Sequence, residues 1–203
     1  KMKTDDRISE ICAMYYGPDT PITMMRNRAV KDALAQGCDY IMMVDSDLSP
    51  DSLYGRDPMA KPFWETAWEF MMTRRHEPSK GSRMPATIAA PYCGPPPHEC
   101  CYIFRWKNFE TNTPNHGYKL EMIEREDSAF RTGIEEVAAL PTGLILYDAR
   151  VFPLIPKPWF DYEWKDDTES EKASTEDVYQ TRNASLCGCP QYVTWDCWAD
   201  HVK

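Results

Sequence analysis

The chain has 203 residues, a formal net charge of −9, an apolar share of 42% and seven tryptophans. These values exclude a disordered chain and fit one domain with a substantial core, and the negative charge disfavours duplex DNA as a partner. No apolar run reaches the ~18–20 residues that span a bilayer, so we expect no transmembrane segment and a cytoplasmic protein. Because the chain opens on KMKTDD, one interpretation is that its first segment is trimmed.

Helical and extended patterns alternate along the first half of the chain. Apolar residues spaced three and four apart predict helices, and short continuous apolar runs predict buried strands. In chain order we expect a strand at Ile11–Tyr16, a helix from Ile22 stopped by Gly37, a central strand at Tyr40–Val44 that is covered on both faces, a helix at Pro62–Arg75 and a strand at Thr87–Pro91.

The second half continues this order after a proline-rich loop. We expect a hairpin of edge strands within CYIFRW and YKLEMI, a strand at Gly143–Tyr147, a helical turn at Asp148–Phe152, a mobile acidic loop at Lys165–Ser174, a helix at Glu176–Ala184 with Ser174 or Thr175 as its N-cap, and a strand at Gln191–Asp196. The alternation predicts an α/β layer protein.

The eight cysteines allow two interpretations. Cys187, Cys189, Cys197 and His201 could hold structural zinc, but their spacing lacks the usual C-x2-C knuckle. The chain is too large and too rich in tryptophan to need disulfide staples. We therefore expect reduced, mostly buried thiols.

Two carboxylates, Asp45 and Asp47, follow the apolar run YIMMV. In an extended segment residues i and i+2 point the same way, so both carboxylates could face one point. That end of a strand is where open α/β sheets bind ligands, and a hard cation such as Mg²⁺ or Mn²⁺ would relieve the repulsion. In the alternative reading, Asp45 ends the strand and Asp47 caps the next turn.

Several segments together resemble one family, the nucleotide-sugar glycosyltransferases of the GT-A fold, family-2-like and of bacterial or phage type. RNRAVKDALAQGCDYIMMVDSDLSP resembles the Arg-Asn helix and the strand that ends in the metal-binding D-x-D. LPTGLILYDARVFPLI resembles the Thr-Gly turn and strand at the sugar site, TEDVYQTRNAS the Glu-Asp helix near the acceptor, and YVTWDCWADH the closing strand with its downstream histidine. The similarity extends from about Ile22 to His201.

This resemblance implies a fold and a division of the chain. The fold would be α/β, GT-A (Rossmann-like), with a mixed, mainly parallel sheet flanked by helices and D-x-D at the C-terminal end of a central strand. Residues 1–203 would form one domain, with a nucleotide-sugar-binding half at about 1–98 and a half at about 99–203 that binds the acceptor and completes the metal site.

The resemblance also implies roles for individual residues. Asp47 would bind Mn²⁺ (or Mg²⁺) directly, with His201 as second protein ligand and close to Asp47 in space, and Asp45 would reach the metal through water or contact the ribose. The remaining donor-binding residues would be Arg26, Thr142 and Gly143.

The same resemblance implies a reaction. Asp177 would act as the general base that deprotonates an acceptor hydroxyl, with Glu176 holding the acceptor, and a single displacement would invert the anomeric carbon. The partners would be a UDP- or GDP-sugar and a glycan or other hydroxyl acceptor. Trp159, Phe160 and Trp164 are candidates for stacking on a sugar. The family's first strand, with its nucleotide-binding loop, has no convincing counterpart before Ile11, which leaves UDP versus GDP open.

Two other functions remain alternatives. A phosphatase of the haloacid-dehalogenase type would use Asp45 as nucleophile and Asp47 as acid, although Ser49 stands where that motif has Thr or Val. A non-catalytic module that binds sugar nucleotides would keep the fold without needing the base.

Overall fold

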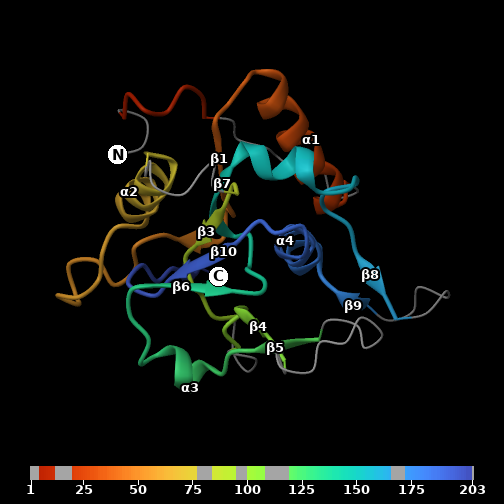
Figure 1. Cartoon of the computed structure of the whole chain (residues 1–203). Coiled ribbons are helices and arrows are strands. Elements are labelled where there is room, and N and C mark those ends of the chain that lie inside the picture. The colour runs from red at the N-terminus through yellow and green to blue at the C-terminus, as the bar shows by residue number, and fades with distance from the viewer. Residues whose placement is uncertain are drawn as a thin grey trace.

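The computed structural model describes residues 5–11, 20–76, 84–94, 100–107, 119–165 and 172–202. Its centre is a five-stranded sheet with helices on both faces (Figure 1). In spatial order the strands are β1 (Tyr40–Val44), β7 (Leu144–Asp148), β3 (Thr87–Ala89), β10 (Gln191–Thr194) and β6 (Ile134–Val137). The helices around the sheet are α1 (Ile22–Ala35), α2 (Phe63–His76), α4 (Glu176–Leu186) and the 3-10 helix η4 (Ala149–Leu154). The fold is therefore mixed α/β, as predicted.

The prediction that most neighbouring strands are parallel is wrong. Only β3 and β10 pair in parallel, and the other three strand pairs are antiparallel. That expectation came from the family resemblance, in whose fold crossover connections make neighbouring strands parallel. Instead β7 inserts between β1 and β3 and runs back along both of them. A strand from the second half of the chain thus separates two strands from the first half.

The position of β1 also differs from the prediction. Within the described residues β1 ends the sheet, so it is not central. Its two faces are nevertheless covered, because Ile41 and Met43 contact one apolar cluster whereas Tyr40 and Met42 contact another. An apolar run reports how much of a strand is covered by helices and not how many strands flank it.

Strand alternation divides the core into two clusters, one on each face of the sheet. On β7, Ile145 and Tyr147 belong to the cluster that contains residues of α1, η4 and α4, whereas Leu144 and Leu146 belong to the cluster under α2. All of these β7 side chains are at most 1% exposed. Side chains two apart share a face of a strand, so the apolar run Leu144–Tyr147 of β7 requires helices on both faces.

Most helices and strands lie where the periodicity predicts them. Helix α1 ends before Gly37, whose φ of 73° suits the left-handed position after a helix. Helices α2 and α4 each run slightly past the predicted end, and η4 is the predicted helical turn. Thr175 is the N-cap residue of α4, although its side chain makes no capping hydrogen bond. The predicted strand at Ile11–Tyr16 lies almost wholly outside the described residues.

Three small strand pairs complete the structure. The predicted edge hairpin is confirmed as β4 (Phe104–Trp106) with β5 (Leu120–Met122), next to the short helix α3 (Arg125–Ser128). Strand β8 (Glu163–Trp164) ends just before the predicted acidic loop and pairs with β9 (Lys172–Ser174), which forms the last three residues of that loop; residues 166–171 are not described. The third pair, β2 (Leu48–Ser49) with β11 (Asp200–His201), was not predicted. No helix among the described residues is long and apolar enough to cross a membrane.

Candidate functional site

The D-x-D segment lies in a turn just beyond β1. The strand ends at Val44, the amide of Asp45 donates to the carbonyl of Gly143 (2.7 Å), and the amide of Leu48 donates back to Asp45 (3.2 Å). Asp45 and Asp47 have different side-chain partners, Arg26 and His201.

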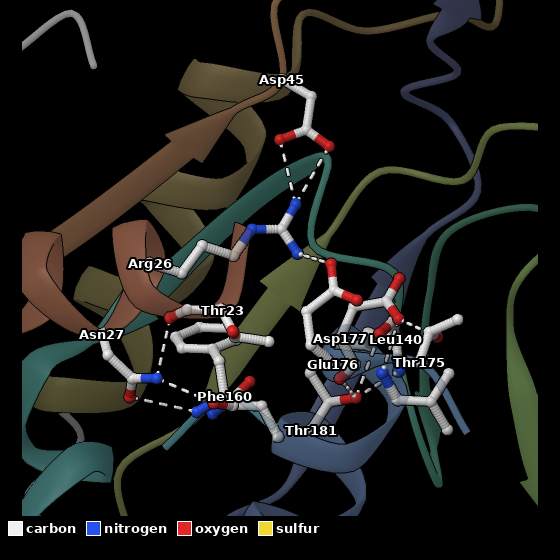
Figure 2. Close-up of polar contacts among 12 residues, drawn as sticks. Thr23, Arg26, Asn27, Asp45, Leu140, Phe160, Thr175, Glu176, Asp177 and Thr181 are labelled. Carbon is white, nitrogen blue, oxygen red and sulfur yellow. Dashed lines mark hydrogen bonds and ion pairs between the residues drawn. The ribbon is translucent and has the colours of Figure 1, made fainter. Parts of the chain in front are cut away.

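Asp45 is held by an arginine. One guanidinium nitrogen of Arg26 contacts both oxygens of Asp45 (3.0 and 3.1 Å), and the other donates to Glu176 (2.9 Å), as Figure 2 shows. Arg26 comes from α1 and Glu176 from the first turn of α4, so one side chain links three elements that are distant in the sequence. The side chains of Arg26 and Glu176 are only 7% and 11% exposed, against 31% for Asp45.

In the triad formed by Arg26, Asp45 and Glu176, burial and the opposite charges of the partners shift the pKa values in opposite directions. Burial by itself would lower the pKa of Arg26, but the carboxylates of Asp45 and Glu176 raise it above its ordinary value. Burial raises the pKa of Glu176, as does the neighbouring Asp177, whereas Arg26 lowers it. The arginine thus offsets part of the effect of burial on Glu176. In the structure the partner of Glu176 is therefore Arg26.

Asn27, the next residue of α1, anchors a loop. Its side-chain amide donates to the carbonyl of Phe160 (2.7 Å), and its oxygen accepts from the amides of Trp159 (2.9 Å) and Phe160 (3.2 Å) (Figure 2). Trp159 and Phe160 are 5% and 1% exposed. The Arg-Asn pair therefore organises two separate contacts, and these two aromatic residues form core instead of a sugar-stacking surface.

Asp47 meets His201, as the resemblance implied. Nε2 of His201 lies 3.9 Å from a carboxylate oxygen of Asp47, although 154 positions separate the two residues in the sequence. The pairing of β2 with β11 produces this proximity, since His201 is opposite Leu48. The amide of Val202 also donates to the carbonyl of Asp47 (2.7 Å). The Asp47 side chain is 58% exposed, so one side of the pair is open to solvent.

These two side chains fit a hard divalent cation that keeps positions for other ligands. A carboxylate oxygen and an imidazole nitrogen are a donor set that suits Mn²⁺, and Mg²⁺ characteristically retains water or phosphate oxygens besides one or two carboxylates. In the part of the chain that the structure describes, no three His, Cys, Asp or Glu side chains gather into a metal-binding group. Asp47 and His201 would leave positions on the ion open to further ligands.

The same finding argues against the zinc alternative. Cys189 and Cys197 are 0% and 1% exposed and belong to different apolar clusters, whereas Cys187 is exposed. His201 lies beside Asp47 instead of beside a thiol. The described cysteines are free, and the three buried ones, Cys101, Cys189 and Cys197, belong to the apolar clusters of the core.

Tyr92 is a site residue that the sequence did not single out. Its ring stacks on His201 (centroids 5.8 Å apart, planes at 15°) and lies edge-on to Tyr102. Burial raises the pKa of Tyr92 well above its ordinary value, and the carboxylates of Asp177 and Asp45 raise it further. The phenol is therefore neutral and lies between the Asp47–His201 pair and the Arg26 triad. Its only sequence signal was its place just after β3.

Gly143 allows this arrangement by having no side chain. A Cβ at this position would lie 2.5 Å from Cδ1 of Leu48 and 2.7 Å from the hydroxyl of Tyr92. Thr142, the residue before it, is fully buried, and its hydroxyl has no hydrogen-bond partner among the described residues. The Thr-Gly turn thus packs directly beneath the D-x-D turn.

Gly143→Ala is expected to lower the free energy of unfolding by about 1–3 kcal/mol, because a methyl group must displace packed side chains. Urea denaturation would measure the loss. The double variant Gly143→Ala/Leu48→Ala is the control for the collision: relief at the Leu48 contact should make the glycine substitution less harmful in that background. An equal loss in both backgrounds would contradict the collision with Leu48 as the cause.

Asp177 is the fourth acidic residue of the region and lies in the first turn of α4, next to Glu176 (Figure 2). One of its oxygens, Oδ1, accepts from the amide of Val178 (2.8 Å) and from the hydroxyl of Thr175. These two donors fix the direction of the carboxylate while it stays partly exposed. Asp177 is therefore oriented and reachable, unlike Glu176.

Comparisons with known proteins give a weak structural similarity and no matching family. No protein-family model matches the chain, and no curated protein matches it. Among solved structures, the chain is similar to A197 from STIV, with 16% sequence identity, 91% of this chain and 69% of that chain covered, and a TM-score of 0.49.

Proposed function

We propose that the chain is a metal-dependent glycosyltransferase that moves a sugar from a nucleotide-sugar donor to an acceptor hydroxyl. The observation that carries this proposal is the convergence at one end of β1. Within one small region lie an open Asp47–His201 pair, a carboxylate fixed by arginine (Asp45) and an oriented, reachable carboxylate (Asp177). Sugar transfer needs a site that stabilises the departing diphosphate and a base for the incoming hydroxyl. These groups would supply both.

The donor side would depend on Asp47 and His201. A divalent cation held there would neutralise charge on the departing diphosphate, which is the chemistry that the metal supplies. Asp45, held in place by Arg26, would orient the donor through a polar contact, because its carboxylate can still accept from a ribose hydroxyl at its 31% exposed surface. Tyr92 beneath His201 would keep the imidazole in place.

The acceptor side would depend on Asp177. A general base must lie within hydrogen-bond reach of the hydroxyl whose proton it takes, and its carboxylate must be accessible. Asp177 meets the second requirement, and its contacts with Thr175 and Val178 preset its orientation. The acceptor oxygen would form the new bond at the anomeric carbon as the bond to the diphosphate breaks, which inverts the configuration.

The phosphatase alternative fits less well. Its nucleophile would be Asp45, whose two oxygens both accept from Arg26. A carboxylate engaged in this way is a weakened nucleophile. The non-catalytic alternative differs from the proposal only in lacking turnover, so an activity assay separates the two.

Thermal shift with a panel of UDP- and GDP-sugars, with and without Mn²⁺, tests the proposal directly. We expect one nucleotide sugar to raise the melting temperature in a Mn²⁺-dependent way, because a ligand that binds only the folded state stabilises it. Mn²⁺-dependent release of a nucleoside diphosphate should follow. No shift with any donor would overturn the proposal, and phosphate release from simple phosphate esters would favour the phosphatase.

Asp47→Ala and His201→Ala are each expected to weaken Mn²⁺ binding by at least about 100-fold, since even the outer-shell partners of metal ligands contribute about 10–100-fold. Isothermal titration with Mn²⁺ measures this loss without requiring activity. Asp200→Ala is the matched control, because it removes the same charge from the exposed side of β11. An equal loss in the control variant would show that only the general negative charge attracts the ion.

A further inference from the structure

Two cysteines face each other beside the candidate site. Cys93 directly follows Tyr92, and Cys101 precedes Tyr102, the two tyrosines that pack edge to face. The two short segments are antiparallel, with Cys93 opposite Cys101 in an isolated bridge. The amide of Gly94 donates to the carbonyl of Cys100 (3.1 Å). The pair therefore sits where two strands of chain are already held together.

The hydrogen-bond pattern fixes which kind of pair this is. A bond from the residue after Cys93 to the residue before Cys101 makes the two cysteines a non-hydrogen-bonded antiparallel pair. In such pairs the Cα atoms are about 4.5 Å apart and the side chains are close. Disulfides need Cα atoms roughly 4.4–6.8 Å apart, so the backbone need not move for the two sulfurs to join.

The two thiols differ in environment in a way that gives them separate roles. The Cys101 thiol is 0% exposed and hydrogen-bonds to Cys93, which is half-buried. This hydrogen bond lowers the pKa of Cys93 to about 7 against the opposing effect of burial, and Arg125 lowers it further. The pKa of Cys101 is raised by the same hydrogen bond and by burial. Cys93 is thus the reachable thiolate and Cys101 its buried neighbour.

We propose that Cys93 and Cys101 form a reversible dithiol site that undergoes thiol–disulfide exchange with low-molecular-weight disulfides. The Cys93 thiolate attacks one sulfur of the small disulfide and releases one thiolate, which leaves a mixed disulfide on Cys93. Cys101 gives its proton to solvent and attacks the Cys93 sulfur, which releases the second small thiolate. The small disulfide gains two electrons and the protein loses two, so the exchange balances.

The consequence for the molecule is a covalent link next to Tyr92. Tyr92 contacts Tyr102 and His201. The disulfide would join Cys93, which follows Tyr92, to Cys101, which precedes Tyr102. A cross-link that closes a short loop restricts the unfolded chain, so the oxidised form should be more stable than the reduced form. This inference does not depend on the proposed enzymatic function.

The test is equilibration of the full-length chain with oxidised and reduced glutathione, followed by acid quenching, alkylation and peptide mapping. We expect a peptide cross-link between Cys93 and Cys101, a mass lower by about 2 Da than that of the reduced chain, and a higher melting temperature that reductant reverses. Cys101→Ser should instead trap glutathione on Cys93, because no resolving thiol remains.

Two matched variants identify the partner and the site. Cys100→Ser, adjacent to Cys101, should still form the cross-link, and so should Cys187→Ser, which removes an exposed thiol far along the chain. The proposal is overturned if glutathione stays on Cys93 in the unmodified sequence, if Cys100→Ser abolishes the cross-link, or if Cys187 reacts while Cys93 and Cys101 stay reduced. The unmodified chain decides the first and third outcomes, so a misfolded variant cannot hide the answer.

Discussion

Asp177→Asn is expected to lower the rate of sugar transfer by about 10²–10⁴-fold, the usual contribution of a positioned general base. An amide cannot take the proton of the acceptor hydroxyl, yet it keeps the size of the side chain and can still accept from Thr175 and Val178. Nucleotide-sugar binding should therefore change little. Transfer kinetics together with thermal shift in Mn²⁺ would measure the two effects separately.

The control for this substitution is Asp127→Asn. Asp127 also lies in the first turn of a helix, α3, but on a short helix remote from α4 in the sequence. Both substitutions remove one negative charge from a helix N-terminus, where such charges are stabilising. If Asp127→Asn slowed transfer as much as Asp177→Asn, or if Asp177→Asn lost donor binding in parallel with turnover, the assignment of Asp177 as base would be contradicted.

Arg26→Ala is expected to lower the free energy of unfolding by about 3–5 kcal/mol, because it leaves a buried carboxylate without its counter-charge. Glu176 is the residue that bears this cost, since its side chain is 11% exposed, whereas Asp45 is 31% exposed and can reach water. Urea denaturation measures the loss. Arg28→Ala, one residue beyond Asn27 on the same helix, is the control: its side chain is 74% exposed, and its ion pair should be worth less than about 1 kcal/mol.

The pH dependence of the Arg26→Ala loss identifies its cause. Burial already raises the pKa of Glu176 above its ordinary value of 4.5, and removal of Arg26 takes away the charge that lowers it. A carboxyl whose pKa is higher in the folded than in the unfolded state does not lower the free energy of unfolding below about pH 4.5, where it is protonated in both states. It lowers that free energy as the pH rises from 4.5 through the folded pKa. The deficit of Arg26→Ala should therefore grow from pH 4.5 toward neutrality.

The double variant Arg26→Ala/Glu176→Gln completes the argument. Glu176→Gln replaces the carboxyl that ionises with a neutral amide. The double variant should therefore regain part of the lost stability at pH 7 and lose the extra pH dependence. A deficit in Arg26→Ala that is the same at pH 4.5 and pH 7 would show that lost packing of the arginine stem, and not the buried charge, is responsible.

Local pattern predicted most of the individual elements. Periodicity located α1, α2 and α4, and the apolar runs located β1, β3 and β7, because helical and extended side-chain repeats are properties of short segments. The failures have a common cause. The direction of β7, the edge position of β1 and the pair β2–β11 all depend on which distant segment lies alongside. No local repeat encodes a partner.

The candidate site divides in the same way. Two carboxylates after an apolar strand, an arginine and an asparagine on the preceding helix, and two acids at the start of α4 could all be read from the sequence. Their partners could not, because these depend on how distant segments pack. The carboxylate of Asp45 contacts Arg26, and the β2–β11 pairing places His201 beside Asp47. The sequence gives the type of each side chain. The contacts between these side chains arise because strand pairing and helix packing join segments up to 154 positions apart.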